Sequence, residues 1–139
     1  MTFNFIQANS DDRAYLLSLR QLTMLEHFEK AGLFLTQKEH EFRLDDTYEC
    51  MHLIHFDNAC IGALKYQETP SIIEIMQLQI PPDFQRRGLG DRVMRELIEL
   101  AGDKHLTLTV LKSNPALKLY QRLGFVITGD DEYEYWMRK

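Results

Sequence analysis

The pattern of apolar and polar residues along this chain is typical of a protein built from both strands and helices. Residues 3–8 alternate as a half-buried strand does. Residues 48–56, 60–67, 72–80 and 105–111 are further predicted strands. Short turn sequences rich in Asp, Asn and Pro separate the middle strands, so we expect them to pair in sequence.

Helical periodicity interrupts these strands in two long segments. Between residues 13 and 30, and again between 88 and 101, apolar side chains recur at helical spacing. A shorter helix is predicted from about Thr36, because Thr36 and Glu39 have the spacing of a capping box.

The last part of the chain predicts one more helix and a closing pair of strands. Asn114-Pro115 predicts a helix start, with Asn as N-cap and Pro at the first helical position, and Gly124 ends that helix. Strands are predicted at 125–128 and 133–137 around a turn at 129–131. The order is therefore β-α-α-β-β-β-α-β-α-β-β, which predicts one α/β domain (α+β, with a mixed sheet) over residues 1–139.

Composition agrees with a single globular domain. The chain has 139 residues, 45% of them apolar, and no apolar run approaches the ~20 residues that span a bilayer. Its first residues lack the basic and apolar regions of a signal peptide, so we expect a cytoplasmic location. The net charge of −5 and the absence of a basic stripe disfavour a nucleic-acid partner, and no membrane partner is expected.

The cysteines and histidines predict no metal site. Cys50 and Cys60 fit no zinc or redox spacing, and we interpret both as packing residues on neighbouring strands. A disulfide between them would need an oxidising compartment. The histidines form no metal-binding pattern, because His52 and His55 are three apart and point to opposite faces of a strand.

The motif Gln85-Arg86-Arg87-Gly88-Leu89-Gly90 lies between the strand that ends at Pro81-Pro82 and an amphipathic helix. Its glycines allow a tight turn and bring backbone N–H groups close to a ligand. These N–H groups open a helix, where amides lack internal partners and the helix dipole is positive, so the turn suits a phosphate or pyrophosphate. Arg86, Arg87 and Arg92 add positive charge. The turn is neither a Rossmann fingerprint, because position 93 is Val93, nor a P-loop.

The element order and two motifs resemble the GNAT superfamily of acyl-CoA-dependent N-acetyltransferases over nearly the whole chain. The family's phosphate loop has Gln or Arg, two variable residues, Gly, one variable residue, and Gly or Ala, and Gln85 to Gly90 match every fixed position. An Asn-led helix that runs into a Tyr and then Gly-Phe is the family's later motif. Asn114, Tyr120 and Gly124-Phe125 correspond to it, with one residue fewer between Asn and Tyr than in many members.

The resemblance implies a site for acetyl-CoA as the acyl donor. The backbone amides from Arg86 to Asp91 would hold its pyrophosphate. In the family the fourth strand bulges and splays from the fifth, and the pantetheine arm pairs with it in the gap. By position, Leu78, Gln79 and Ile80 would supply those main-chain contacts, and the Leu78 N–H would polarise the acetyl carbonyl. The cofactor-binding residues implied are Leu78, Gln79, Ile80, Gln85, Arg86, Arg87, Gly88, Leu89, Gly90, Asp91, Asn114 and Tyr120.

Two side chains are implied in proton transfer. Tyr120 matches the family's usual general acid, which protonates the thiolate leaving group; the alternative is a packed aromatic on a helix face with Leu117 and Leu123. Glu74 precedes Gln85 by the offset of the general-base glutamate in histone-acetylating members. Among apolar neighbours it could be partly buried, as a base would be. An outward-facing, solvated Glu74 is the alternative, and an ordered water or an already neutral amine could replace it.

The chain therefore resembles an enzyme that moves acetyl from acetyl-CoA to a primary amine, with a small-molecule acceptor favoured. Direct transfer in a ternary complex is expected, because neither cysteine lies in the cofactor motifs. A non-catalytic acyl-CoA-binding regulatory module is the rival from another class. A protein acetyltransferase acting on lysines or N-termini is a third interpretation, which differs only in its acceptor.

The acceptor side and the oligomeric state carry weaker signals. The family builds its acceptor site from the first two helices and their loop. Weaker candidates for substrate contact are Gln77, Tyr48, His52, Glu26 and His27. A homodimer is an option, because dimers are common in the family and the C-terminal hairpin presents Tyr133, Tyr135 and Trp136. These aromatics could equally pack on their own core.

Overall fold

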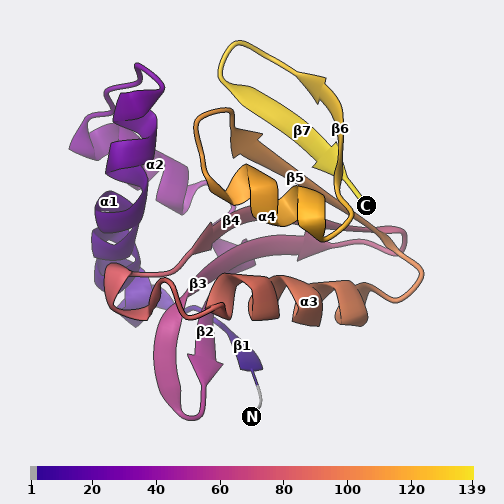
Figure 1. Ribbon diagram of the computed structural model, residues 1–139. Helices are drawn as coiled ribbons and strands as arrows, with labels where there is room; N and C mark the ends of the chain where they lie inside the picture. Colours follow the sequence, from indigo (N-terminus) through magenta and orange to yellow (C-terminus); the bar gives the residue numbers. More distant parts are fainter. Residues whose placement is uncertain (1–2) are drawn as a thin grey trace.

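The computed structural model describes residues 3–139, without the side chains of residues 25 and 26. A seven-stranded mixed sheet, in the order β1-β2-β3-β4-β5-β7-β6, runs through the molecule (Figure 1). Within the described residues, no helix is both long and apolar enough to span a bilayer. The strands are β1 (Phe3–Gln7), β2 (Met51–Phe56), β3 (Ala59–Glu68), β4 (Ile72–Gln79), β5 (His105–Leu111), β6 (Val126–Asp130) and β7 (Glu134–Arg138). The helices are α1 (Arg13–Lys30), α2 (Gln37–Asp45), α3 (Leu89–Ala101) and α4 (Ala116–Arg122).

The predicted fold class and element order are confirmed. Strand β4 runs parallel to β5, and every other neighbouring pair is antiparallel, so the sheet is mixed. One boundary differs, because residues Tyr48–Cys50 form a 3₁₀ turn where a strand start was predicted. Thr47 has a left-handed backbone (φ 53°), which turns the chain before β2 begins. Cys50 is therefore buried in this turn, and both it and Cys60 of β3 are free thiols.

Helix α2 begins where the capping box predicts. The Glu39 N–H donates to Thr36 Oγ1 (3.2 Å), and the Thr36 N–H donates to Glu39 Oε1 (3.1 Å). At the other end, Lys65 of β3, only 4% exposed, donates to the carbonyl oxygens of Arg43 (3.1 Å) and Asp46. A buried lysine thus satisfies carbonyl groups at the end of α2 and fixes this helix against the sheet.

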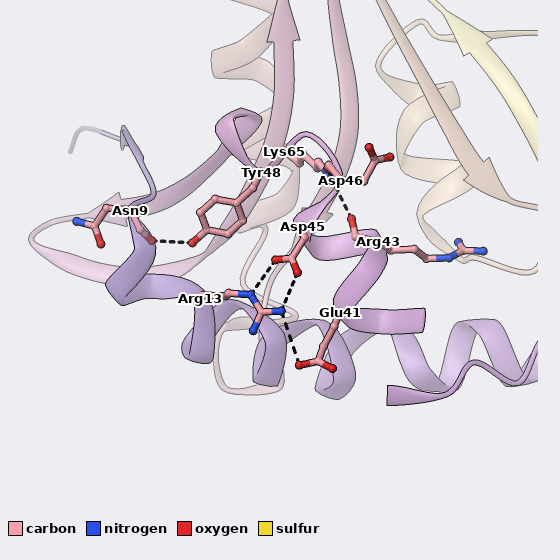
Figure 2. A network of polar contacts seen from close by, with 8 residues as sticks. All are labelled: Asn9, Arg13, Glu41, Arg43, Asp45, Asp46, Tyr48 and Lys65. Carbon is pink, nitrogen blue, oxygen red and sulfur yellow. Dashed lines mark hydrogen bonds and ion pairs between the residues drawn. The ribbon is translucent and has the colours of Figure 1, made fainter. Parts of the chain in front are cut away.

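Helices α1 and α2 are also joined at their surface. Arg13 forms a bidentate pair with Asp45 at 2.7 and 2.8 Å, and its guanidinium lies 3.7 Å from Glu41 (Figure 2). The Tyr48 hydroxyl donates to the Asn9 carbonyl oxygen (2.7 Å) beside them. Exposed pairs contribute little free energy, but these contacts fix how the two helices lie relative to each other.

The main core lies between the sheet and helices α3 and α4, which cover one face (Figure 1). Ile73 and Ile75 of β4 point into it and meet Val93 and Leu97 of α3, all of them buried. The predicted apolar stripe of α3 is therefore confirmed. A smaller cluster packs α1 and α2 on the sheet and consists of Ala8, Leu16, Leu19, Leu44, Met51 and Ala63.

Strands β4 and β5 pair only over part of their length. The parallel ladder joins Ile72–Ile75 to His105–Leu108, and beyond Ile75 the two strands separate. A register shift in the β3–β4 ladder, where Tyr66 faces Ile75 and Lys65 faces Gln77, leaves Met76 as the extra residue of a bulge. The bulge and the splay that the family resemblance implied are thus both present, and they open the sheet near its centre.

Strand β3 approaches the end of β4 very closely at Gly62. A Cβ atom built on Gly62 would lie 2.3 Å from the carbonyl oxygen of Gln79. Only glycine fits beside that carbonyl group, because no side chain can occupy a space already filled by backbone.

Candidate active site

A cavity of about 190 Å³ occupies the gap between the splayed strands. Residues 75–78 of β4 and 108–111 of β5 form its sides. Helices α1 and α2 contribute Met24, Phe28 and Arg43, and the opposite wall carries Asn114, Tyr120 and Glu134. Segments from most of the chain therefore converge on this one hollow.

Tyr120 of α4 is both packed and part of the cavity. It is 9% exposed, and its ring lies edge-on to Phe125, with 6.0 Å between centroids. The Gly124–Phe125 turn positions it, because Gly124 is left-handed (φ 98°) and the Phe125 N–H returns to the Tyr120 carbonyl oxygen (3.0 Å). Burial raises the pKa of Tyr120 to about 12, so the phenol stays protonated at neutral pH. Its hydroxyl has no hydrogen-bond partner among the described residues.

Asn114 lies on the same cavity and starts α4. Its Oδ1 accepts a hydrogen bond from the Ala116 N–H (2.9 Å). The helix begins one residue later than predicted, at Ala116, and Pro115 occupies the N-cap position. The capping side chain is nevertheless that of Asn114.

Residues at the end of β4 line both this cavity and a second, separate hollow. Leu78 lines the cavity, and Ile80, just beyond the strand, lines the second hollow. Gln79 lies between them with its side chain 2% exposed, and it lines neither of them. The contacts implied for residues 78–80 are main-chain contacts, so the buried side chain of Gln79 does not count against them, and their role stays a prediction.

The second hollow, of about 260 Å³, is formed by the glycine-rich loop at the start of α3. Gln85 holds this loop against β4, because its Nε2 donates to the Ile80 carbonyl oxygen (2.7 Å). Arg86 (φ 62°) and Gly88 (φ 72°) are both left-handed, so the chain turns twice before the helix begins. Such turns direct successive N–H groups toward one point and make a concave site for an anion. The loop residues that line the hollow are Gln85, Arg86, Gly88, Leu89, Gly90 and Asp91.

The amides of this loop are available to a ligand. The Gln85 N–H donates to the carbonyl oxygen of Pro82 (3.2 Å), and the Arg92 N–H donates to the carbonyl oxygen of Gly88 (3.1 Å). Between them, no amide from 86 to 91 donates to a backbone carbonyl oxygen in the described part of the chain. The Asp91 carboxylate accepts from Arg95 (2.8 Å) one turn later in α3.

The positive charge around the hollow differs from the prediction. The Arg92 guanidinium lies over the rings of Phe3 (5.6 Å) and Phe56 (5.1 Å), so it leaves the loop. Arg87 lies over Phe84 (5.6 Å) and does not line the hollow. Arg122, at the end of α4, lines it instead. The sequence analysis missed Arg122 because its nearness to the loop depends on how α4 packs.

Glu74 does not join Tyr120. Its side chain is exposed and borders a separate hollow beside β5 and β7. Successive strand residues face opposite sides, so Ile73 and Ile75, which point into the core under α3, direct Glu74 to the other face. Of the two alternatives for Glu74, the structure has the outward-facing, solvated side chain, and its role as a base stays a prediction.

Glu134, the first residue of β7, is a cavity residue that the sequence analysis missed. It pairs with Leu111 at the end of β5 and is half-buried. Burial and the nearby charge of Asp131 raise the pKa of Glu134, while the Arg43 charge acts in the opposite direction. A carboxylate with a raised pKa on the same cavity as Tyr120 has the properties of a general base.

The weaker acceptor-side candidates separate into two groups. Gln77 lines the cavity. Tyr48 donates to a loop carbonyl, His52 stacks on a neighbouring tyrosine ring (4.3 Å), and His27 is half-buried; none of these three lines the cavity in the described structure. The side chain of Glu26 lies outside the described residues.

Comparison with known proteins gives one family over most of the chain. The model of the acetyltransferase (GNAT) family matches residues 14–125. A spermine/spermidine N(1)-acetyltransferase of Bacillus subtilis (strain 168) is 24% identical, over 96% of this chain and 93% of that protein. A mycothiol acetyltransferase of Corynebacterium aurimucosum is 29% identical over 52% of this chain, and the match spans only 24% of that longer protein.

Solved structures share the fold. An acetyltransferase from Thermus thermophilus superposes with a TM-score of 0.77 at 19% identity, covering 100% of this chain and 97% of that one. The PaiA N-acetyltransferase from Thermoplasma acidophilum, solved in complex with coenzyme A, gives a TM-score of 0.71 at 14% identity, with 100% and 99% covered. At these identities the likeness concerns the fold.

Proposed function

The chain belongs to the acetyltransferase (GNAT) family, and from that premise we propose that it transfers an acetyl group from acetyl-CoA directly to a primary amine. The observation that supports this most is a pair of hollows near the end of β4, one lined by Ile80 and the other by Leu78. One carries a loop of amides suited to a pyrophosphate, and the other carries Tyr120. A donor that reaches from one to the other passes Leu78 and Ile80.

The residues present fit coenzyme A as the bound donor. The amides from 86 to 91 and Arg122 suit the pyrophosphate. In the described sheet, main-chain groups of β4 beyond Ile75 have no strand partner on the β5 side, so an extended arm can pair there. When bound, acetyl-CoA supplies an activated carbonyl carbon with a thiolate leaving group.

Three groups of this chain then handle the protons and charge. Glu134 accepts the proton that the attacking amine must lose, and the amine nitrogen forms a bond to the acetyl carbon. The Leu78 N–H donates to the carbonyl oxygen as negative charge develops there. Tyr120 gives its proton to the sulfur as the carbon–sulfur bond breaks, and the products are an amide and a free thiol.

A small acceptor agrees best with the shape of the site. Helices α1 and α2, both central strands, α4 and β7 all contribute to the walls of the cavity, and its volume suits a small molecule better than a protein segment. The test is acetyl-CoA turnover, followed by release of free thiol, across polyamines, amino acids, aminoglycosides and short peptides. Tight binding of acetyl-CoA with no turnover on any of these amines would favour the regulatory binding module.

The two loop glycines are expected to respond differently to alanine. Gly88 is left-handed, so an alanine there costs ~1–2 kcal/mol and should weaken acetyl-CoA binding by about 5- to 30-fold. A Cβ on Gly90 would meet only the side chains of Ile80 and Leu119, both at 3.8 Å. Calorimetric titration should therefore give a Kd for Gly90→Ala within about threefold of the parent. Equal losses in both variants would contradict this loop as the pyrophosphate site.

Glu134 should control the acidic limb of the pH profile. Its carboxylate must be ionised to accept a proton, so kcat/KM falls as the pH drops through its raised pKa, above the ordinary glutamate value of about 4.3. Glu134→Gln should remove this limb and lower kcat/KM by ~10²-fold or more at pH 8. Glu132→Gln, on the exposed loop before β7, is the control. If the acidic limb of the pH profile is the same in Glu134→Gln as in the parent, another group is the general base.

A further inference from the structure

Arg20 of α1 is a buried cation whose donors lack partners. The residue is 1% exposed, and its Nε donates to Nδ1 of His40 at 3.2 Å. In the part of the chain that the structure describes, Nη1 and Nη2 of Arg20 are buried with no hydrogen-bond partner, and so is Nε2 of His40. Buried polar groups in folded proteins are almost always paired, so Arg20 is a buried charge without a compensating partner among the described residues.

Among the described residues, no acid of α2 compensates this charge. The carboxylates of Asp45 and Glu41 face Arg13, and Glu39 bonds within its own capping box. The neighbouring cations Arg43 and Lys65 add to the electrostatic cost of the Arg20 charge. Burial first, and then the charge of Arg43, lower the pKa of Arg20 to about 10. Burial lowers the pKa of Lys65, the Asp46 charge acts in the opposite direction, and the charge of Arg20 lowers it further.

Phe28 lines the cavity and lies against the two cations Arg20 and Arg43. The guanidinium carbons of Arg20 and Arg43 lie 5.6 and 5.2 Å from the centroid of the Phe28 ring. Phe28 and Arg43 both line the cavity that contains Tyr120. Figure 2 shows the Arg43 side chain extending away from the Arg13–Asp45 pair, and no ion pair of Arg43 occurs among the described residues. Among the described residues, the charge on the α1–α2 wall of the cavity is therefore positive.

The opposite wall carries the acid Glu134, so the two walls differ in sign. We propose that the acceptor is a small amine that also bears a carboxylate, as an amino acid does. The carboxylate binds the Arg43 guanidinium, with Arg20 behind Phe28 adding to the positive field, and the amine faces Glu134 and Tyr120. This assignment rests on the proposed acetyl transfer and adds the class of its acceptor.

The same wall disfavours a polyamine. The Bacillus subtilis relative is named for spermine and spermidine, but a polycation in this cavity would meet the like charge of Arg43 with Arg20 behind it. Juxtaposed like charges act against binding, and the acid on the far wall accommodates only one ammonium group. Selectivity for a carboxylate over a polyamine is the measurable consequence.

The test compares two acceptors that differ only at the carboxylate, leucine and leucinamide, and adds a polyamine. We would measure kcat/KM for leucine, leucinamide and spermine by thiol release, corrected for the fraction of neutral amine. Leucine should exceed leucinamide by at least about tenfold, as expected for one charge-assisted contact, and Arg43→Gln should reduce the ratio to within about twofold. Lys38→Gln, which removes an exposed charge elsewhere on α2, should keep the ratio.

Better turnover of leucinamide or spermine would overturn the acceptor class and leave the acetyltransferase intact. Acetyl-CoA binding without turnover of any amine would overturn the proposed function and this inference together.

A second variant reports on Arg20 without relying on activity. Arg20→Met keeps the volume and removes a buried, unpaired charge, so Tm should rise by about 3 °C or more. The leucine preference should fall in the same variant. A lower Tm would mean that the charge of Arg20 already stabilises the fold, and it would overturn the contribution of Arg20 to the positive field beside the cavity.

Discussion

Tyr120→Phe is expected to lower kcat by ~10²-fold or more, because it removes the proton that the departing sulfur takes up. The change deletes one oxygen atom and keeps the ring, so packing against Phe125 remains. The lost hydroxyl makes no hydrogen bond among the described residues, and the free energy of unfolding should change by less than about 1 kcal/mol. Single-turnover kinetics with saturating acetyl-CoA would isolate the chemical step.

Tyr66→Phe is the matched control for this prediction. Tyr66 is a half-buried tyrosine of β3 that stacks on His52 and lines neither the cavity nor the loop hollow. It should retain the parent kcat. A Tyr120→Phe enzyme with kcat within about threefold of the parent would make Tyr120 a packing residue only, since a general acid contributes 10²-fold or more.

Gly62→Ala is expected to destabilise the fold by about 3 kcal/mol, the upper range for overpacking, because backbone meets the new atom. The added Cβ would lie 2.3 Å from the Gln79 carbonyl oxygen, so β3 must move away from β4. Urea unfolding should show a lower midpoint with an unchanged slope. The displacement also shifts the end of β4, and acetyl-CoA binding should weaken in step.

Gly90→Ala serves as the control for Gly62→Ala. It adds the same atom, but that atom would find only ordinary side-chain contacts at 3.8 Å. Alanine also favours the helix that Gly90 helps to begin. The urea midpoint of Gly90→Ala should therefore equal or exceed that of the parent protein. Equal midpoints for the two variants would mean that β3 and β4 adjust freely at Gly62.

Local signals predicted the elements that local chemistry dictates. The capping box of Thr36 and Glu39, the apolar stripe of α3 and the loop from Gln85 to Gly90 all depend on neighbours within a few residues. The same alternation that correctly placed Ile73 and Ile75 in the core also directs Glu74 outward. The apolar neighbours of Glu74 left a partly buried side chain open as an alternative, and the strand periodicity decides for the outward-facing one.

The missed residues depend on long-range register. Glu134 reaches the cavity because it pairs with Leu111, and Arg122 reaches the loop because α4 packs beside α3. Arg20 looks like one more charged residue on an amphipathic helix, and only the packing of α2 over α1 buries it. Such placements follow from the assembled sheet, so a local pattern carries no sign of them.

The partial ladder between β4 and β5 has a mechanical consequence. In the described sheet, only four residue pairs of the β4–β5 ladder join its two halves, so we expect each half to exchange its amide hydrogens as a separate cooperative unit. Helix α3 packs on both halves of the sheet and holds them together. A ligand that binds both the loop from Gln85 to Gly90 and the gap between β4 and β5 would contact both halves of the sheet. Its binding should then raise the protection of amide hydrogens in both halves together.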